Sequence, residues 1–214
     1  MTTLTGKIST ALMALLMAAC GAEPAPEKQS GVIDPSSGSV EALVPDVIAA
    51  TNAGAVRGET NDGVLSFKGV RYGADTSTTR FAAPAKPQPW DGVKSAVDFG
   101  ATCPQTPTGN PGGLFTSWAT VPTPPMSEDC LFLNVWTPAL ADGVKRPVMV
   151  WFHGGGFSSG SGSSRAYEGV RLAQRGDVVV VTVNHRLNVL GYLALGHYGE
   201  GYEDSAVAGV LDMV

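Results

Sequence analysis

Two short apolar runs, residues 148–152 and 178–183, constrain the fold of this chain more than any other feature. Both are nearly continuous instead of alternating with polar residues, which is typical of strands buried on both faces of a parallel sheet. Between them, apolar residues recur at helical spacing over residues 165–175 and Gly176 follows, so a short helix is predicted there. A strand, a helix and a strand in this order predict a right-handed βαβ unit.

The first of these runs leads directly into His153 and three consecutive glycines, Gly154, Gly155 and Gly156. Glycines let backbone N–H groups face a cleft with no side chain in the way. Such groups can hydrogen-bond an oxygen on which negative charge develops. We therefore take Gly155 and Gly156 as candidate donors. His153 is interpreted either as a residue that shapes this loop or as a hydrogen-bonded core histidine.

Upstream of these strands, the sequence predicts a small antiparallel region. Residues 47–51 and 55–59 are β-type runs on either side of a turn at 52–54, and residues 64–73 form another after Asp62 and Gly63. These spacings predict hairpins. A further strand is expected at residues 131–136.

Composition excludes several classes of protein. The chain has 214 residues, of which 43% are hydrophobic and 15% charged, so it can bury a core and is not disordered. Its 27 glycines and 15 prolines predict many turns and connections. The net charge is −5 and no cluster of lysine and arginine occurs, which argues against nucleic-acid binding.

Residues 1–20 resemble a bacterial lipoprotein signal. Lys7 is followed by an apolar run over residues 11–19, too short to span a bilayer, and then by Cys20 as the candidate lipidation site. An ordinary cleaved secretion signal and a retained hydrophobic N-terminus are the alternatives. Residues 21–45, rich in Pro, Ser, Gly and Glu, predict a flexible tether. We expect an exported protein of the bacterial cell envelope, anchored to the membrane through lipid.

The three cysteines fit this expectation. An odd thiol in an exported protein requires an explanation, and acylation of Cys20 would leave Cys103 and Cys130 as a candidate disulfide pair. Two unrelated buried thiols are the alternative.

Residues 204–214 read as a helix capped by Asp204, with Val207, Val210, Leu211 and Val214 on one apolar side, and no stop signal follows. A parallel sheet with few strands would also leave an apolar edge exposed. We therefore expect the 214 residues of this chain to be the N-terminal part of a longer protein.

Residues 46–214 resemble the type B carboxylesterases, the carboxylesterase and cholinesterase family of the α/β-hydrolase fold. The matching motifs are VRG at 56–58, FKGVRYG at 67–73, RFAAP at 80–84, PWDG at 89–92, CPQ at 103–105, SEDCLFLNVWTP at 127–138, VWFHGGGF at 150–157 and VNHRLNVLGYLAL at 183–195. The resemblance implies a truncated α/β-hydrolase fold, in which N-terminal antiparallel hairpins lead into the first parallel strands of the central sheet.

The family pattern implies roles for several residues. Gly155 and Gly156 match two of the three oxyanion-hole donors, and the third donor follows the catalytic serine. Cys103 and Cys130 match a family disulfide, whereas Arg80 and Glu128 match a structural salt bridge.

The implied activity is hydrolysis of small-molecule carboxylic esters by a serine, with no metal or organic cofactor. Nucleophile, acid and base are expected outside this chain, which would be inactive alone. The alternatives are a non-catalytic surface adhesion protein of the same fold and an inactive fragment.

The chain departs from the family pattern at two positions near the second apolar run. His185 stands where the family commonly has tyrosine, and Asn188 replaces a usual glycine. Phe115 and Trp118, between the two cysteines, are interpreted as walls of a substrate gorge or as loop aromatics packed for stability.

Residues 156–160 satisfy the pattern G-x-S-x-G, and Ser158, Asp177 and His197 follow the triad order of α/β-hydrolases. A nucleophile elbow needs a helix immediately after its serine. Ser158 is instead followed by SGSGSSR, which predicts a flexible segment. We therefore interpret Ser158 as a polar loop residue and not as a nucleophile.

Overall fold

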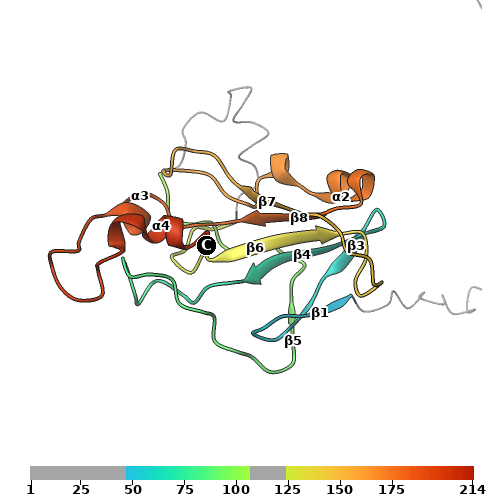
Figure 1. Ribbon diagram of the computed structural model, residues 1–214, viewed down its shortest axis with the longest axis horizontal. Helices are drawn as coiled ribbons and strands as arrows, with labels where there is room; N and C mark the ends of the chain where they lie inside the picture. Colours follow the sequence, from blue (N-terminus) through green and yellow to red (C-terminus); the bar gives the residue numbers. More distant parts are fainter. Residues whose placement is uncertain (1–46, 107–123) are drawn as a thin grey trace, which may run out of the picture. The chain divides into compact units, whose positions relative to one another are not determined.

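The central element of the protein is a five-stranded sheet with the order β3-β4-β6-β8-β7 (Figure 1). The computed structural model describes residues 47–106 and 124–214, and all of them belong to one unit, Val44–Val214. The strands of this sheet are β3 (Glu59–Asn61), β4 (Val64–Arg71), β6 (Phe132–Thr137), β7 (Val148–Phe152) and β8 (Val179–Val183).

Two pairing modes divide this sheet. Strand β6 runs antiparallel to β4 and to β8, whereas β7 and β8 are parallel, with Val148 opposite Val179 and Phe152 opposite Val183. Helix α2 (Val170–Gly176) connects the two parallel strands and packs over β4, β6 and β8. The predicted strand-helix-strand unit and the α/β class are thus confirmed.

The connection between β7 and β8 differs from the single helix predicted over residues 165–175. A 3-10 turn, η1 (Arg165–Tyr167), is followed by a break, and α2 begins only at Val170. The break lies over the core, since a Cβ atom on Gly169 would approach the Trp136 ring to 2.8 Å. The backbone must pass this close to the indole, and one continuous helix does not provide that path.

The predicted hairpins are present. Strand β1 (Ile48–Ala50) pairs antiparallel with β2 (Ala55–Arg57), and β3 pairs antiparallel with β4. The turn between β3 and β4 places Asp62 at φ 48° and Gly63 at φ 78°, as expected for Asp-Gly in a two-residue hairpin turn.

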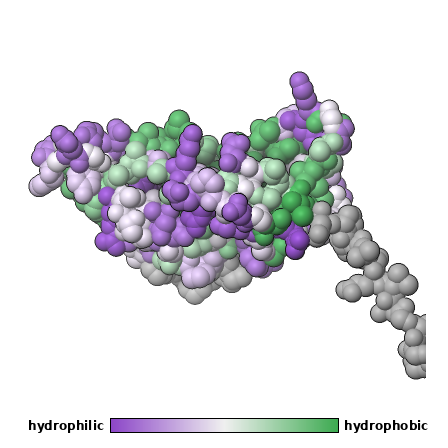
Figure 2. All heavy atoms as spheres, turned by 90° about the horizontal axis from the view of Figure 1, so that it is seen from below, coloured by the Kyte–Doolittle hydropathy of each residue, from purple (hydrophilic) through white to green (hydrophobic). Residues whose placement is uncertain are grey.

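A third strand, which the sequence did not predict, completes a small second sheet. Strand β5 (Val93–Ser95) pairs in parallel with β2, giving the order β1-β2-β5. Figure 2 views the molecule from below, the side on which β1 and β5 lie in Figure 1, and shows hydrophilic residues over the middle of this face and hydrophobic residues gathered toward its right side.

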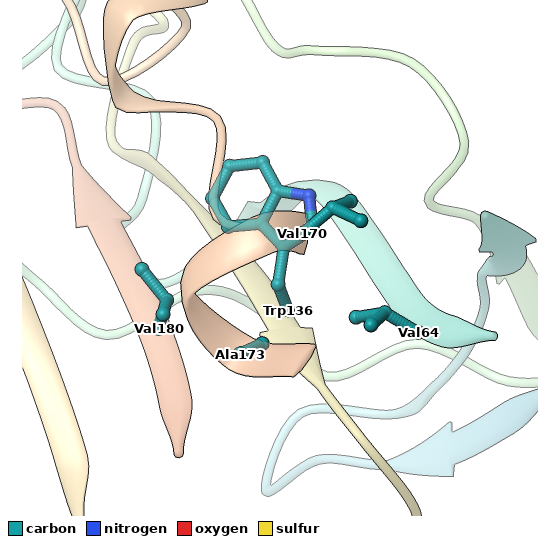
Figure 3. Packing of buried hydrophobic residues seen from close by; sticks show 5 residues of the cluster. All are labelled: Val64, Trp136, Val170, Ala173 and Val180. Atoms are coloured by element: carbon teal, nitrogen blue, oxygen red, sulfur yellow. The ribbon is translucent and has the colours of Figure 1, made fainter. Parts of the chain in front are cut away.

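The main hydrophobic cluster lies between α2 and the large sheet. Trp136 of β6 is only 1% exposed and packs with Val64, Val170, Ala173 and Val180, as Figure 3 shows. These side chains come from three strands and one helix, so the cluster holds α2 against the sheet. Burial of apolar area of this kind is the main stabilising contribution to such a fold.

Strand β7 contradicts one prediction. We expected burial on both faces, but its five side chains are between 43% and 60% exposed. The reason is its position: β7 is an edge strand, at the upper side of the sheet in Figure 1, and the described residues cover little of it. The ring of Tyr167 packs against Trp151 with 5.2 Å between centroids. Strand β8, by contrast, is buried at Val180, Thr182 and Val183.

Short helical segments follow β8: α3 (Asn188–Tyr192), η2 (Ser205–Val207) and α4 (Ala208–Leu211). None of the helices in the described ranges has the length and hydrophobicity needed to cross a bilayer.

The apolar side of the last helix is largely exposed in this chain. Val207, Val210 and Val214 are 44%, 39% and 101% exposed, whereas Ala208 and Asp212 are buried. Asp204 also makes no side-chain cap hydrogen bond. This orientation buries Asp212, whose carboxylate forms an ion pair with Arg186. A buried carboxylate without a partner costs more free energy than an exposed valine side chain does.

Candidate functional site

The glycine loop after β7 adopts a conformation that only glycine accommodates at its centre. Gly155 has φ 126°, and a Cβ atom there would lie 2.0 Å from the carbonyl oxygen of Ser159. Gly156 and Phe157 follow, each with φ 59°. Gly154 differs, since an added Cβ would meet nothing within 4 Å. The sequence requirement for glycine is therefore strict at Gly155.

A tight turn fixes the carbonyl of Gly155. It accepts hydrogen bonds from the amides of Ser158 (3.1 Å) and Ser159 (3.3 Å), and from the Ser158 hydroxyl (2.9 Å). Within residues 47–106 and 124–214, the amides of Gly155 and Gly156 donate to no other residue. Gly155 and Gly156 are both exposed, so two adjacent N–H donors are available to a ligand.

One of these glycines borders an open hollow of about 550 Å³. Its lining is mostly apolar and consists of Gly156, Phe157, Ser158, Asn188, Val189, Tyr192 and Leu193. An anion-stabilising amide beside an apolar surface suits a ligand that joins a polar carbonyl to apolar groups.

Gln105 supports the loop from outside. Its side-chain oxygen accepts from the Gly160 amide and its nitrogen donates to the Gly160 carbonyl, each at 2.8 Å. Gly160 has no room for a side chain, because a Cβ atom would lie 2.3 Å from Nδ1 of His153. Sequence reasoning did not assign this role to Gln105, although the residue belongs to the CPQ motif.

The segment after the loop is not flexible, contrary to the prediction from SGSGSSR. Ser161 and Ser163 are each only 4% exposed. The Asn184 side-chain oxygen accepts from the Gly162 amide (2.8 Å) and from the Ser161 hydroxyl (3.1 Å). A glycine and serine composition predicts flexibility only where no partner satisfies the backbone, and here Asn184 is such a partner.

Two further polar side chains complete this buried network. Asn134 of β6 donates to the Gly162 carbonyl (3.3 Å) and to the Thr182 hydroxyl (2.9 Å), while that hydroxyl donates to the same carbonyl (2.8 Å). Sequence reasoning missed Asn134 and Asn184. A polar residue inside an apolar strand was the available signal, since buried polar groups need partners.

The rings of His153 and His185 stack beneath the glycine loop, with centroids 4.5 Å apart and an interplanar angle of 13°. Nδ1 of His153 lies 3.0 Å from the Gly154 carbonyl oxygen, and Nδ1 of His185 lies 3.1 Å from that of Arg186. Carbonyl oxygens only accept hydrogen bonds, so both Nδ1 atoms carry a proton.

Burial opposes a charge on either ring. It lowers the pKa of His153 to about 4, an effect that the Gly154 carbonyl partly offsets and the neighbouring His185 reinforces. Burial likewise lowers the pKa of His185. Both rings are therefore neutral near pH 7, and His153 acts as a hydrogen-bonded structural histidine within the loop.

Ser158, Asp177 and His197 do not form a triad. The Ser158 hydroxyl donates to Gly155, Asp177 accepts from Arg146 at 2.7 Å, and the His197 ring packs against Tyr198. Each side chain has a different local partner, in agreement with the interpretation of Ser158 as a polar loop residue.

The candidate disulfide and salt bridge are both present in the structure. Cys103 and Cys130 are joined with an S–S distance of 2.05 Å, and Arg80 donates through Nε to Glu128 at 2.7 Å. Cys20, Phe115 and Trp118 lie outside the described residues.

No group of three or more His, Cys, Asp or Glu side chains suited to a metal ion occurs in the described part of the chain.

Comparison with known proteins gives this geometry a context. The model of the carboxylesterase family matches residues 45–214. The para-nitrobenzyl esterase of Bacillus subtilis (strain 168) is 41% identical over 166 residues, which is 77% of this chain and 32% of that protein. The acetylcholinesterase of Electrophorus electricus is 38% identical over 170 residues, 76% of this chain and 26% of that enzyme.

Solved structures agree with the sequence matches. A Clostridium hathewayi esterase that can hydrolyse aliphatic aromatic polyesters superposes with a TM-score of 0.71 at 45% identity, over 80% of this chain and 33% of that one. A Geobacillus stearothermophilus carboxylesterase gives 0.68 at 43% identity, over 78% and 32%. The chain thus spans about a quarter to a third of the length of these relatives. It carries the α/β-hydrolase fold in part and belongs to the carboxylesterase family.

Proposed function

We propose that this chain supplies the oxyanion-binding part of a serine carboxylic ester hydrolase. The observation that carries the proposal is the pair of adjacent amides at Gly155 and Gly156 that donate to no described residue, with Gly156 lining an apolar hollow. Their position at the end of β7 agrees with the family pattern of a strand followed by HGGG.

In the proposed mechanism, a serine hydroxyl from outside these 214 residues attacks the ester carbonyl while a histidine takes its proton. The carbonyl oxygen becomes an oxyanion and accepts hydrogen bonds from Gly155 and Gly156, with a third from the residue after the serine. Collapse of the tetrahedral intermediate releases the alcohol, which receives the proton from the histidine. Water then hydrolyses the acyl-enzyme by the same steps.

The substrates proposed are small-molecule carboxylic esters. Phe157, Val189 and Leu193, which line the hollow at Gly156, are apolar and exposed. They suit contact with an apolar acyl or alcohol group. No cofactor is part of this mechanism, because the charge on the intermediate is stabilised by amides and the proton moves through a histidine.

The test compares Gly155→Ala with Gly154→Ala in the complete protein, with hydrolysis of a p-nitrophenyl ester as the assay. The methyl group at 155 collides with the Ser159 carbonyl, whereas the one at 154 has free space. Gly155→Ala should therefore lower kcat by roughly 100-fold or more, the cost of one misplaced oxyanion donor. Gly154→Ala should retain most activity.

Hydrolysis that disappears on alanine substitution of the elbow serine would establish the enzyme. A complete protein with no elbow serine and no hydrolysis would instead favour the alternative, a non-catalytic surface protein of the same fold. Equal activity of Gly155→Ala and the wild type would overturn the role of the glycine loop.

We further propose that the protein is exported and anchored to the bacterial envelope through acylated Cys20. Residues 1–20 carry the signal pattern, and the Cys103–Cys130 disulfide suits an oxidising compartment. Labelling of cells with a fatty-acid analogue should mark the wild type and fail to mark Cys20→Ser. Label retained in Cys20→Ser would exclude this anchor.

A further inference from the structure

The segment that follows β8 contacts the glycine loop through His185 and Asn188. His185, only 2% exposed, stacks on His153 from below and presents its ring to the edge of Phe157, with 6.3 Å between centroids. His153 and Phe157, which flank Gly154–Gly156 in the sequence, therefore both contact the His185 side chain.

Asn188 makes two hydrogen bonds to the far end of the same loop. Its amide donates to the Phe157 carbonyl (2.9 Å), and its side-chain nitrogen donates to the Ser158 carbonyl (2.9 Å). Asn188 itself has φ 54°, a left-handed conformation that asparagine adopts more readily than most residues. The backbone shape here does not require a side chain, since glycine would adopt it at no cost.

The loop needs such support because Phe157 is strained. A bulky residue at φ 59° is disfavoured and persists only where its surroundings hold it. The Asn188 amide fixes its carbonyl, while the rings of His185 and Tyr192 contact its side chain. Release of Phe157 would let Gly156, its neighbour in the chain, rotate away from the donor geometry.

We propose that His185 and Asn188 are positioning residues that hold the amides of Gly155 and Gly156 in place for oxyanion binding. The kinetic part of this proposal rests on the proposed function.

The geometry also predicts what His185 contributes. Its Nδ1 proton is already used by the Arg186 carbonyl, and the contacts to His153 and Phe157 are made by the ring. The aromatic surface is therefore the functional part. His185→Tyr should keep the stack, whereas His185→Ala should lose it.

The experiment measures hydrogen exchange and kinetics in the complete protein with the variants Asn188→Gly, His185→Ala and His185→Tyr. Asn188→Gly preserves the left-handed backbone and removes only the side-chain bond to Ser158. His197→Ala is the matched control, because it removes an exposed ring that contacts Tyr198.

The amides of Ser158 and Ser159 donate to the Gly155 carbonyl. Their hydrogen-exchange rates therefore measure how firmly the loop conformation is held, and this measurement does not require catalytic activity. We expect faster exchange in Asn188→Gly and His185→Ala, and wild-type exchange in His185→Tyr and His197→Ala. A wild-type exchange rate in Asn188→Gly would overturn the proposed positioning role. This result is independent of whether the protein hydrolyses esters.

In the kinetic arm, Asn188→Gly and His185→Ala should lower kcat roughly 10- to 100-fold, as small displacements of catalytic groups do, and change KM little. His185→Tyr should restore most of kcat. Unchanged kcat in Asn188→Gly would refute the positioning role. A wild-type protein without hydrolysis would refute the proposed function. The exchange rates would still decide whether His185 and Asn188 hold the loop in place.

Discussion

Arg186 and Asp212 form an ion pair in which both side chains are buried, with 2% and 0% of their surfaces exposed. The guanidinium donates to both carboxylate oxygens, through Nε at 2.9 Å and through Nη2 at 2.7 Å. It also donates to the carbonyl oxygens of Ala82 (2.8 Å) and Ala208 (3.4 Å). One arginine thus connects the end of β8, the segment at Ala82 and helix α4.

Removal of one partner of this pair should destabilise the protein strongly. Asp212→Ala leaves the Arg186 charge buried without a counter-ion, which typically costs about 3 to 5 kcal/mol. Urea unfolding of the complete protein measures this change. The matched control is Asp204→Ala, since Asp204 is exposed and makes no cap hydrogen bond; it should lie within about 0.5 kcal/mol of the wild type. Equal midpoints for both variants would contradict the structural role of the pair.

The disulfide should stabilise the region around the candidate site. Cys103 and Cys130 are buried beside Leu131 and Leu187, and the bond restricts the unfolded chain. The double variant Cys103→Ala/Cys130→Ala should lose about 2 to 5 kcal/mol of stability. Thermal unfolding with and without dithiothreitol provides the check: the reductant should lower the wild-type Tm and leave the variant unchanged. A reductant effect of equal size on both proteins would contradict this assignment.

Acid should weaken the fold through His153. Its folded-state pKa is lowered from 6.5 to about 4 by burial, so between these pH values the unfolded state binds more protons than the native state. The free energy of unfolding therefore decreases as pH falls from about 6.5 to 4, by at most ~3 kcal/mol for this group. Above pH 6.5 its contribution is fully present.

His153→Asn provides the comparison, because its amide can donate to the Gly154 carbonyl and does not titrate. Urea unfolding at pH 7, 6, 5 and 4.5 should show a steeper loss for the wild type than for the variant. Parallel curves would mean that the imidazole does not titrate as its burial requires.

Local signals in the sequence sufficed for much of the fold. Asp62 and Gly63 favour a two-residue hairpin turn, and the apolar runs around a helical segment favour parallel strands. Both features depend on residues close together in the chain, and both are present. The glycines at the candidate site were recognisable because their conformation excludes other residues, most clearly at Gly155.

The missed features depend on contacts between distant parts of the chain. The break between η1 and α2 is set by Trp136, and the order in SGSGSSR is set by Asn134 and Asn184. Neither contact produces a periodic pattern in the neighbouring sequence. The apolar run of β7 favoured burial on both faces, whereas its exposure reflects its place at the sheet edge, in agreement with the expected exposed apolar edge.

Gln105 offers the sharpest single-atom test of the support behind the glycine loop. Gln105→Glu keeps the size of the side chain and replaces the nitrogen that donates to Gly160 and Cys103 by an oxygen. The carboxylate then faces two carbonyl oxygens instead of donating to them. In a fully buried site such a mismatch costs about 1 to 3 kcal/mol, and more when the group is charged; Gln105 is partly buried, so the cost should be smaller.

We expect Gln105→Glu to lower Tm and, in a complete protein that hydrolyses esters as proposed, to lower kcat as well, since Gly160 packs closely against His153. Gln174→Glu is the matched control, because Gln174 makes one exposed bond to the Asp62 carbonyl. It should leave both quantities unchanged. If Gln105→Glu lowers Tm but leaves kcat intact, Gln105 stabilises the fold without contributing to the donor geometry. If it changes neither quantity, the hydrogen bonds between Gln105 and Gly160 do not contribute to stability.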